Sequence, residues 1–173
     1  MRIVVSVTVL LLVHLAAYPQ TDVIKWNKDV KIEWSDFKGK TDEKSAFAAM
    51  SAVGFYYKYN TAVNGNVYKI KFTTEATFDR TRSWSKKNSH TPVILKHEQL
   101  HFDIAELVAR AFKREAEHSV YSKYYKNEIG RIFDKYSLTL QQLQRKYDLQ
   151  SMHSNNKAKQ NDWQRIIHEE LQK

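Results

Sequence analysis

Two histidines and a glutamate lie mid-chain at the spacing found in metal-dependent hydrolases. His97, Glu98 and His101 form the pattern H-E-x-x-H. On a helix, residues i and i+4 lie on one face with Cβ atoms about 6 Å apart, so both imidazoles can reach one ion. The glutamate lies next to that face, where it can take a proton from a metal-bound water. The pattern therefore predicts one catalytic Zn²⁺ ion, with His97 and His101 as ligands and Glu98 as general base.

The surrounding sequence predicts the helix that this pattern requires. Thr91 is a suitable N-cap, and Pro92 suits the first helical position. No other Gly or Pro follows until Gly130, so we expect a helix over residues 92–117. At 100° per residue, both histidines fall in the middle of its apolar face. The structural alternative is a pair of buried neutral histidines, but burying polar rings without partners is costly, so metal binding explains the pattern better.

The pattern leaves the third protein ligand of a catalytic zinc site open. Glu106 is near in sequence but faces away from both histidines on the helical wheel. The ligand must therefore come from a later segment that packs against this helix, and Asp148 and His153 are the candidates. Asp148 could instead orient a ligand histidine, whereas His153 lies in an irregular polar stretch that can fold back over the site.

The rest of the chain predicts strands first and helices afterwards. Asn64-Gly65 is the strongest hairpin signal in the sequence. Apolar and polar residues alternate, or cluster as in strands, over residues 23–26, 30–34, 52–59 and 67–72. Helical spacing follows over residues 120–149, with a kink or division expected at Gly130 or residues 137–139, and over residues 162–171. We therefore expect an α+β fold, with an N-terminal twisted antiparallel sheet packed on the long H-E-x-x-H helix and a helical C-terminal part.

The N-terminus has the pattern of a secretory signal peptide. Met1-Arg2 precede an apolar run over residues 3–15, and small residues follow. This run is shorter than the roughly 20 residues of a membrane span. We predict a signal peptide over residues 1–18 and a single domain over residues 19–173. The protein is then exported, periplasmic or secreted, with no stable membrane span after cleavage.

Composition excludes several other kinds of site. The 173 residues include no Cys, which excludes a disulfide framework, a thiolate metal site and a cysteine nucleophile. Four Gly leave no room for a glycine-rich phosphate loop. The net charge of +9 comes from 28 Lys and Arg against 19 Asp and Glu, and acidic residues are interspersed in the basic helices. We therefore expect no nucleic-acid partner, and the sequence does not fix an oligomeric state.

Three separated motifs resemble one bacterial family. They are residues 34–39, which resemble W-x-D-F-x-G; residues 95–106 with Ala109-Arg110 around H-E-x-x-H; and residues 147–153 with Gln160 and Trp163, which resemble Y-D-x-x-T-x-H-G followed by Q-x-x-W. The family is catalogued as domain of unknown function 922 and is predicted to contain secreted zinc-dependent proteases of the zincin type. Ser151 and Ser154 stand where its pattern has Thr and Gly.

The resemblance implies a zincin-like fold and a zinc site. It places His153 at the histidine of T-x-H-G, and for this reason we prefer His153 to Asp148 as the third ligand. We predict a zinc metallopeptidase that hydrolyses peptide bonds of a peptide or protein substrate with a zinc-activated water, Glu98 acting as general base. Tyr147 or Arg110 could assist the oxyanion.

Two other functions are compatible with the sequence. The first is a non-catalytic zinc-containing binding or structural module of the cell envelope, although such a module has no need of Glu98 as a base. The second is a basic surface protein that binds an anionic envelope polymer, which the mixed charges of the long helices disfavour.

Overall fold

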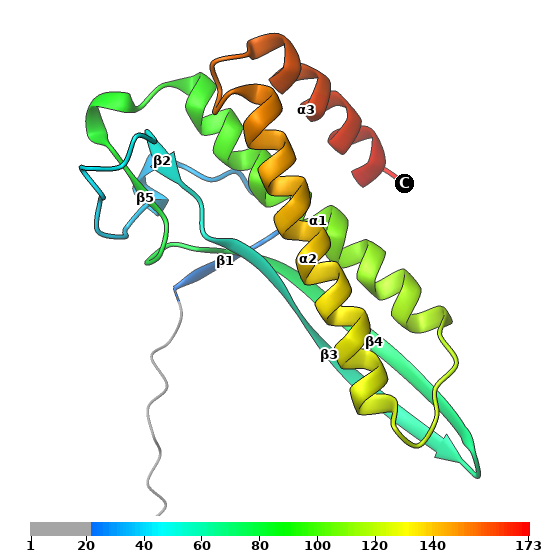
Figure 1. Ribbon diagram of the computed structural model, residues 1–173. Helices are drawn as coiled ribbons and strands as arrows, with labels where there is room; N and C mark the ends of the chain where they lie inside the picture. The colour runs from blue at the N-terminus through cyan, green and yellow to red at the C-terminus, as the bar shows by residue number, and fades with distance from the viewer. Residues whose placement is uncertain (1–21) are drawn as a thin grey trace, which may run out of the picture.

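A long β-hairpin and three helices dominate residues 22–173, the part of the chain that the computed structural model describes. The predicted signal peptide over residues 1–18 lies outside this part. Strands β1 (Val23–Lys25), β3 (Val53–Asn64) and β4 (Val67–Asp79) form an antiparallel sheet in the order β1-β4-β3. Helices α1 (Pro92–His118), α2 (Tyr125–Ser151) and α3 (Lys157–Leu171) lie on one side of this sheet (Figure 1). The predicted α+β class is confirmed.

The hairpin forms at the predicted turn, and its strands are longer than expected. The register is unbroken from Val53↔Phe78 to Asn64↔Val67. Gly65 has φ 57°, a left-handed conformation that glycine adopts without steric cost. Because side chains alternate along a strand, one face of the hairpin carries the aromatic residues that pack on α1 and α2. The Phe112 ring of α1, for example, packs edge-on against the Phe72 ring of β4, with centroids 5.8 Å apart.

A second, very short sheet lies beside the start of α1. It consists of β2 (Ala49–Met50) and β5 (Trp84–Ser85), paired antiparallel. Two-residue strands give no periodic signal, so the sequence did not predict them. Nearby, the Gly39 N–H donates to the Ser83 carbonyl at 2.7 Å, and a Cβ at Gly39 would lie 2.7 Å from that oxygen. Only glycine allows this close approach of the two backbone segments.

Helix α1 begins and ends almost where the sequence predicts. Thr91 Oγ1 accepts from the Ile94 N–H at 3.2 Å, as expected of an N-cap. On the side away from the histidines, the buried Asp103 carboxylate accepts from Trp26 Nε1 at 2.9 Å and contacts His168 Nε2 of α3 at 3.2 Å. These two contacts connect α1 to the segment after β1 and to α3. Within α1, Gln99 Nε2 donates to the same carboxylate at 3.0 Å.

The strand predicted over residues 30–34 is wrong. The Ile32 N–H donates to the Gln99 side chain at 2.9 Å, so this segment binds α1 through a side-chain acceptor instead of joining a sheet. A 3-10 helix, η1 (Trp34–Asp36), follows, and Asp36 closes it by accepting from the Glu33 N–H at 2.7 Å. A second 3-10 turn, η2 (Lys87–Ser89), precedes α1.

Two predicted helix starts are also wrong. Helix α2 begins at Tyr125 and not at residue 120. The Glu128 carboxylate holds Ser122 in a turn before the helix, because it accepts from the Ser122 N–H at 3.0 Å and from the Ser122 hydroxyl at 2.6 Å. It then continues through Gly130 and residues 137–139 without the expected division. Helix α3 begins five residues earlier than predicted, because Asn156 caps it at the Lys159 N–H. None of the helices within residues 22–173 has the length and apolar character needed to cross a membrane.

Candidate metal centre

The two histidines of H-E-x-x-H lie side by side on the inner face of α1. Their rings are perpendicular, with centroids 4.7 Å apart, and the two Nε2 atoms are 3.1 Å from each other. Both residues are buried, as their place on the apolar face predicts. The i, i+4 spacing therefore brings two ring nitrogens to one point, as expected.

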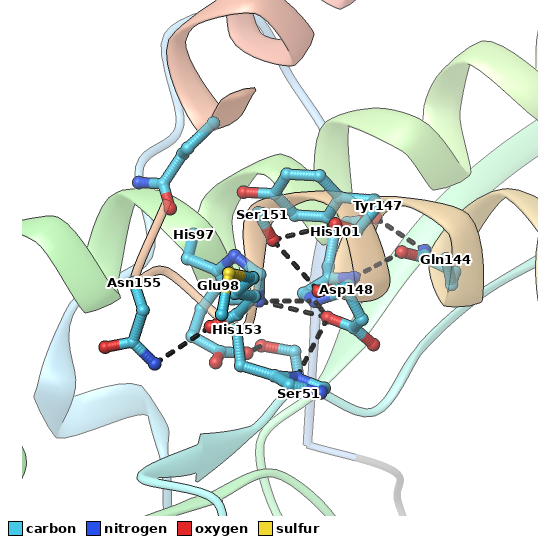
Figure 2. A network of polar contacts seen from close by, with 12 residues as sticks. Ser51, His97, Glu98, His101, Gln144, Tyr147, Asp148, Ser151, His153 and Asn155 are labelled. Atoms are coloured by element: carbon cyan, nitrogen blue, oxygen red, sulfur yellow. Dashed lines mark hydrogen bonds and ion pairs between the residues drawn. The ribbon is translucent and has the colours of Figure 1, made fainter. Parts of the chain in front are cut away.

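Asp148 of α2 completes a group of three donors at this point. Its Oδ1 lies 3.1 Å from His97 Nε2 and 3.0 Å from His101 Nε2 (Figure 2). Burial alone would raise the pKa of Asp148, but the hydrogen bonds from His101 and His97 outweigh it and hold this pKa well below its usual range. Burial likewise opposes the charged form of His101, yet Asp148 and the nearby Glu98 charge raise its pKa.

Gln144 fixes which nitrogen of His101 carries the proton. The Gln144 Nε2 donates to the His101 backbone carbonyl at 2.9 Å, so its Oε1 faces His101 Nδ1 as an acceptor. Neutral His101 therefore carries its proton on Nδ1 and directs the lone pair of Nε2 at the Asp148 carboxylate. Two lone pairs 3.0 Å apart repel unless a cation lies between them, and this cation is a proton or a metal ion.

The group fits a metal ion. Ligand atoms of a tetrahedral zinc site lie about 2.0–2.1 Å from the ion and hence about 3.3 Å from each other. The three donor atoms here are 3.0–3.1 Å apart. Two imidazole nitrogens and one carboxylate oxygen are ordinary zinc ligands. The group His97–His101–Asp148 could therefore hold a metal ion, although its identity does not follow from the geometry.

Glu98 lies beside this group at the bottom of an open cleft. The cleft has a volume of about 550 Å³ and lies between β2, the start of β3, α1 and α2. Ser51 Oγ donates to Glu98 Oε2 at 2.5 Å and holds the carboxylate in place. The cleft has both polar and apolar walls, the latter formed mainly by Phe47, Val53, Phe55, Ile94 and Leu140.

His153 lies next to the group and contacts it through Asp148. Its Nδ1 is 3.5 Å from Asp148 Oδ1, and its ring centroid is 6.5 Å from that of His97. The side chain is exposed and packs against Phe47 across the cleft, with ring centroids 4.6 Å apart. Met152, His153 and Ser154 all have positive φ, at 48°, 48° and 74°. This left-handed turn after α2 directs His153 toward the cleft.

The other residues considered from the sequence lie away from the cleft. Glu106 and Arg110 form an ion pair at 2.8 Å, and Arg110 also binds the Leu171 carbonyl of α3. The Tyr147 ring stacks on His97 with centroids 4.5 Å apart, but its hydroxyl is buried and has no hydrogen-bond partner within residues 22–173. Tyr147 therefore forms a wall of the donor group and does not present a hydroxyl to the cleft.

Sequence reasoning missed Gln144 and Ser51. Gln144 lies four residues before Asp148, so the two share one face of α2, and this spacing is a signal that a search for histidine partners could have used. Ser51 follows a two-residue strand and has no comparable local signal.

A comparison with known protein families gives one match. Residues 29–154, well over half of the chain, match a family described as "Bacterial protein of unknown function (DUF922)". The matched range includes all of the residues discussed above for the donor group and the cleft. No curated protein and no solved structure matches the chain.

Proposed function

The chain belongs to the DUF922 family of bacterial proteins, and we propose that it is a zinc-dependent peptidase with its active site at the His97–His101–Asp148 group. The observation that carries the proposal is the presence of Glu98 beside this group in an open cleft. A purely structural metal site is closed and needs no free carboxylate, whereas a hydrolytic site needs both a base and access for a substrate.

Three residues would hold the ion. We assign His97, His101 and Asp148 as ligands, because their donor atoms already converge, and we assign His153 a supporting contact to Asp148. Bound zinc would supply a Lewis acid that polarises a carbonyl group and acidifies water. Gln144 keeps the lone pair of His101 directed at the group.

Glu98 would transfer the proton. Its carboxylate accepts a proton from water in the cleft and returns it to the amine that leaves. Ser51 restricts the rotation of this carboxylate, so the base is oriented before a substrate arrives. His153, at the cleft rim, can donate a hydrogen bond to a substrate oxygen.

The edge of β2 offers a place for an extended peptide. The Lys86 N–H donates to the Ala48 carbonyl at 2.8 Å, and Ala49 is the next residue in register. In an antiparallel pair the backbone groups of successive residues alternate in direction, so the N–H and C=O of Ala49 point away from β5. Within residues 22–173, β2 pairs with β5 alone, and residues 47–51 line the cleft. A substrate strand could pair at this edge.

The test is metal-dependent proteolysis by the purified protein. Metal analysis should find about one zinc per chain, and a quenched-fluorescence peptide library should be cleaved until a chelator is added and again after zinc is restored. Glu98→Gln is the matched control, because it keeps shape and ligands but removes the base. Zinc retention with equal cleavage by both proteins would contradict the role of Glu98. Zinc retention with no cleavage of any peptide would favour the non-catalytic module.

The place of action is a further part of the proposal. If residues 1–18 are a signal peptide, the peptidase works in the periplasm or outside the cell. N-terminal sequencing of the protein recovered from its host would identify a cleavage site or its absence.

A further inference from the structure

Four apolar side chains are exposed at the end of the molecule farthest from the donor group. This distal end comprises the hairpin tip (residues 60–70) and the connection between α1 and α2 (residues 119–124). Val63, Val67, Val120 and Tyr124 have exposed fractions of 56%, 57%, 98% and 60%. Single exposed apolar residues are ordinary, but several in two adjoining loops indicate a contact surface.

The two loops adjoin because the start of α2 packs on the hairpin. The Tyr125 ring lies 5.5 Å from that of Tyr68 and 6.2 Å from that of Tyr59, centroid to centroid. Figure 1 shows the connection between α1 and α2 running down beside the hairpin, with the start of α2 close to its tip. The short sheet of β2 and β5 and the start of α3 lie at the other end.

The distal end and the segments that adjoin it are also basic. Residues 56–73 and 111–131 contain eight Lys or Arg and three Asp or Glu, so they carry +5 of the +8 net charge of residues 22–173. Three exposed lysines lie at or next to the distal end. Lys69 is opposite Ala62 on the outer face of the hairpin, Lys123 lies over the Tyr124 ring at 5.1 Å, and Lys126 is in the first turn of α2. Of the acidic side chains, Glu115 is already paired with Lys135 at 2.5 Å, and Glu128 binds Ser122.

We propose that the distal end binds the surface of an anionic lipid bilayer. Apolar side chains that enter the headgroup region, with lysines beside them, are the combination that such a surface attracts. A second copy of the chain would bring the same positive charge and be repelled. A soluble anionic polymer would be attracted by the lysines but gains nothing from four exposed apolar side chains. Binding in this way holds the chain at a membrane by the end of the molecule that is farther from the cleft.

Vesicle sedimentation tests the proposal on the full mature chain. The protein should bind vesicles of phosphatidylcholine with 30% phosphatidylglycerol, and raising the salt to about 0.5 M should weaken this binding because exposed charges are screened. Pure phosphatidylcholine vesicles should bind much less. The triple change Lys69→Gln, Lys123→Gln and Lys126→Gln should weaken binding about 100-fold, from about fivefold per lysine near an anionic surface. Its matched control removes three exposed lysines from the other end, Lys44, Lys87 and Lys157.

A second set of variants tests the contribution of the exposed apolar residues. Val63→Ser with Val120→Ser should weaken vesicle binding about tenfold without a change of charge, because the methyl groups no longer leave water. Soluble polyphosphate is the competing ligand, and its binding should not respond to this change. Equal weakening by the two lysine triples, or vesicle binding that ignores the serine changes, would overturn the proposal. If the serine changes leave vesicle binding unchanged and the protein binds polyphosphate as tightly as vesicles, the partner is an anionic polymer.

Discussion

Replacing Asp148 or His153 separately distinguishes a metal ligand from its neighbour. Asp148 Oδ1 is 3.0–3.1 Å from both ring nitrogens, whereas the contact of His153 is to Asp148 itself, at 3.5 Å. Zinc binding worth about 10–16 kcal/mol over four ligands corresponds to about 2.5–4 kcal/mol for each, or roughly 100- to 1,000-fold in affinity. A contact that only orients a ligand contributes about 10- to 100-fold, and the exposure of His153 places it at the lower end.

Thermal unfolding with and without zinc measures this difference. At a free zinc concentration about 1,000 times the dissociation constant, binding adds about 4 kcal/mol to stability, which corresponds to a Tm increase of roughly 8–16 °C for a chain of this size. At the same zinc concentration, His153→Ala should keep about two thirds of this increase. Asp148→Asn should keep a third or less.

The control is the Tm of each variant without metal, which separates loss of binding from loss of fold. If His153→Ala lost more of the zinc-dependent increase than Asp148→Asn, the third ligand would be His153, as first expected from the sequence, and the geometric argument would be refuted. Equal losses would mean that both residues bind the ion.

Three further predictions follow from the same region. Glu98→Gln should keep the zinc-dependent Tm increase but lower peptide cleavage about 10²- to 10⁴-fold, which a cleavage assay at saturating zinc checks. In the metal-free protein, the lowered pKa of Asp148 stabilises the fold above its usual value of 3.8, and the raised pKa of His101 stabilises it below its usual value of 6.5. Urea unfolding should therefore show a contribution that is present between pH 3.8 and 6.5, declines as the pH rises above 6.5 and is absent in Asp148→Asn. An unchanged pH dependence in that variant would contradict the linkage. Met152→Gly should stabilise the protein by about 0.5–1 kcal/mol, or about 1–4 °C in Tm, because an exposed methionine at φ 48° is replaced by a residue without a Cβ; a lower Tm would show that its side chain contributes packing.

Local signals made α1 and the hairpin predictable. Thr91 and Pro92 define the start of α1, and the apolar periodicity that follows places both histidines on its inner face. The Asn64-Gly65 dipeptide likewise predicts a tight turn, and Gly65 adopts the left-handed conformation that such a turn needs. In each case the physical cause acts between residues that are near one another in the chain.

Contacts between distant segments made the rest unpredictable. Residues 30–34 alternate like a strand, but the Ile32 N–H binds the Gln99 side chain, a partner 67 residues away. The sequence identified both Asp148 and His153 as candidate ligands. Their ranking depends on how α2 packs on α1, because Asp148 is 51 residues from His97 in the sequence. The resemblance favoured His153, while the packing places Asp148 Oδ1 3.0–3.1 Å from the Nε2 atoms of both histidines.

The buried Asp103 carboxylate has a mechanical consequence for the donor group. It lies two residues after His101, about 200° around the helix axis, and its bonds to Trp26 and His168 resist any turning of α1 about that axis. An imidazole nitrogen about 6 Å from the axis moves about 1 Å when the helix turns by 10°. Productive sites tolerate only about 0.5 Å of such displacement. The orientation of both histidines is therefore set in part by contacts on the far side of α1, made by residues that touch neither the donor group nor the cleft.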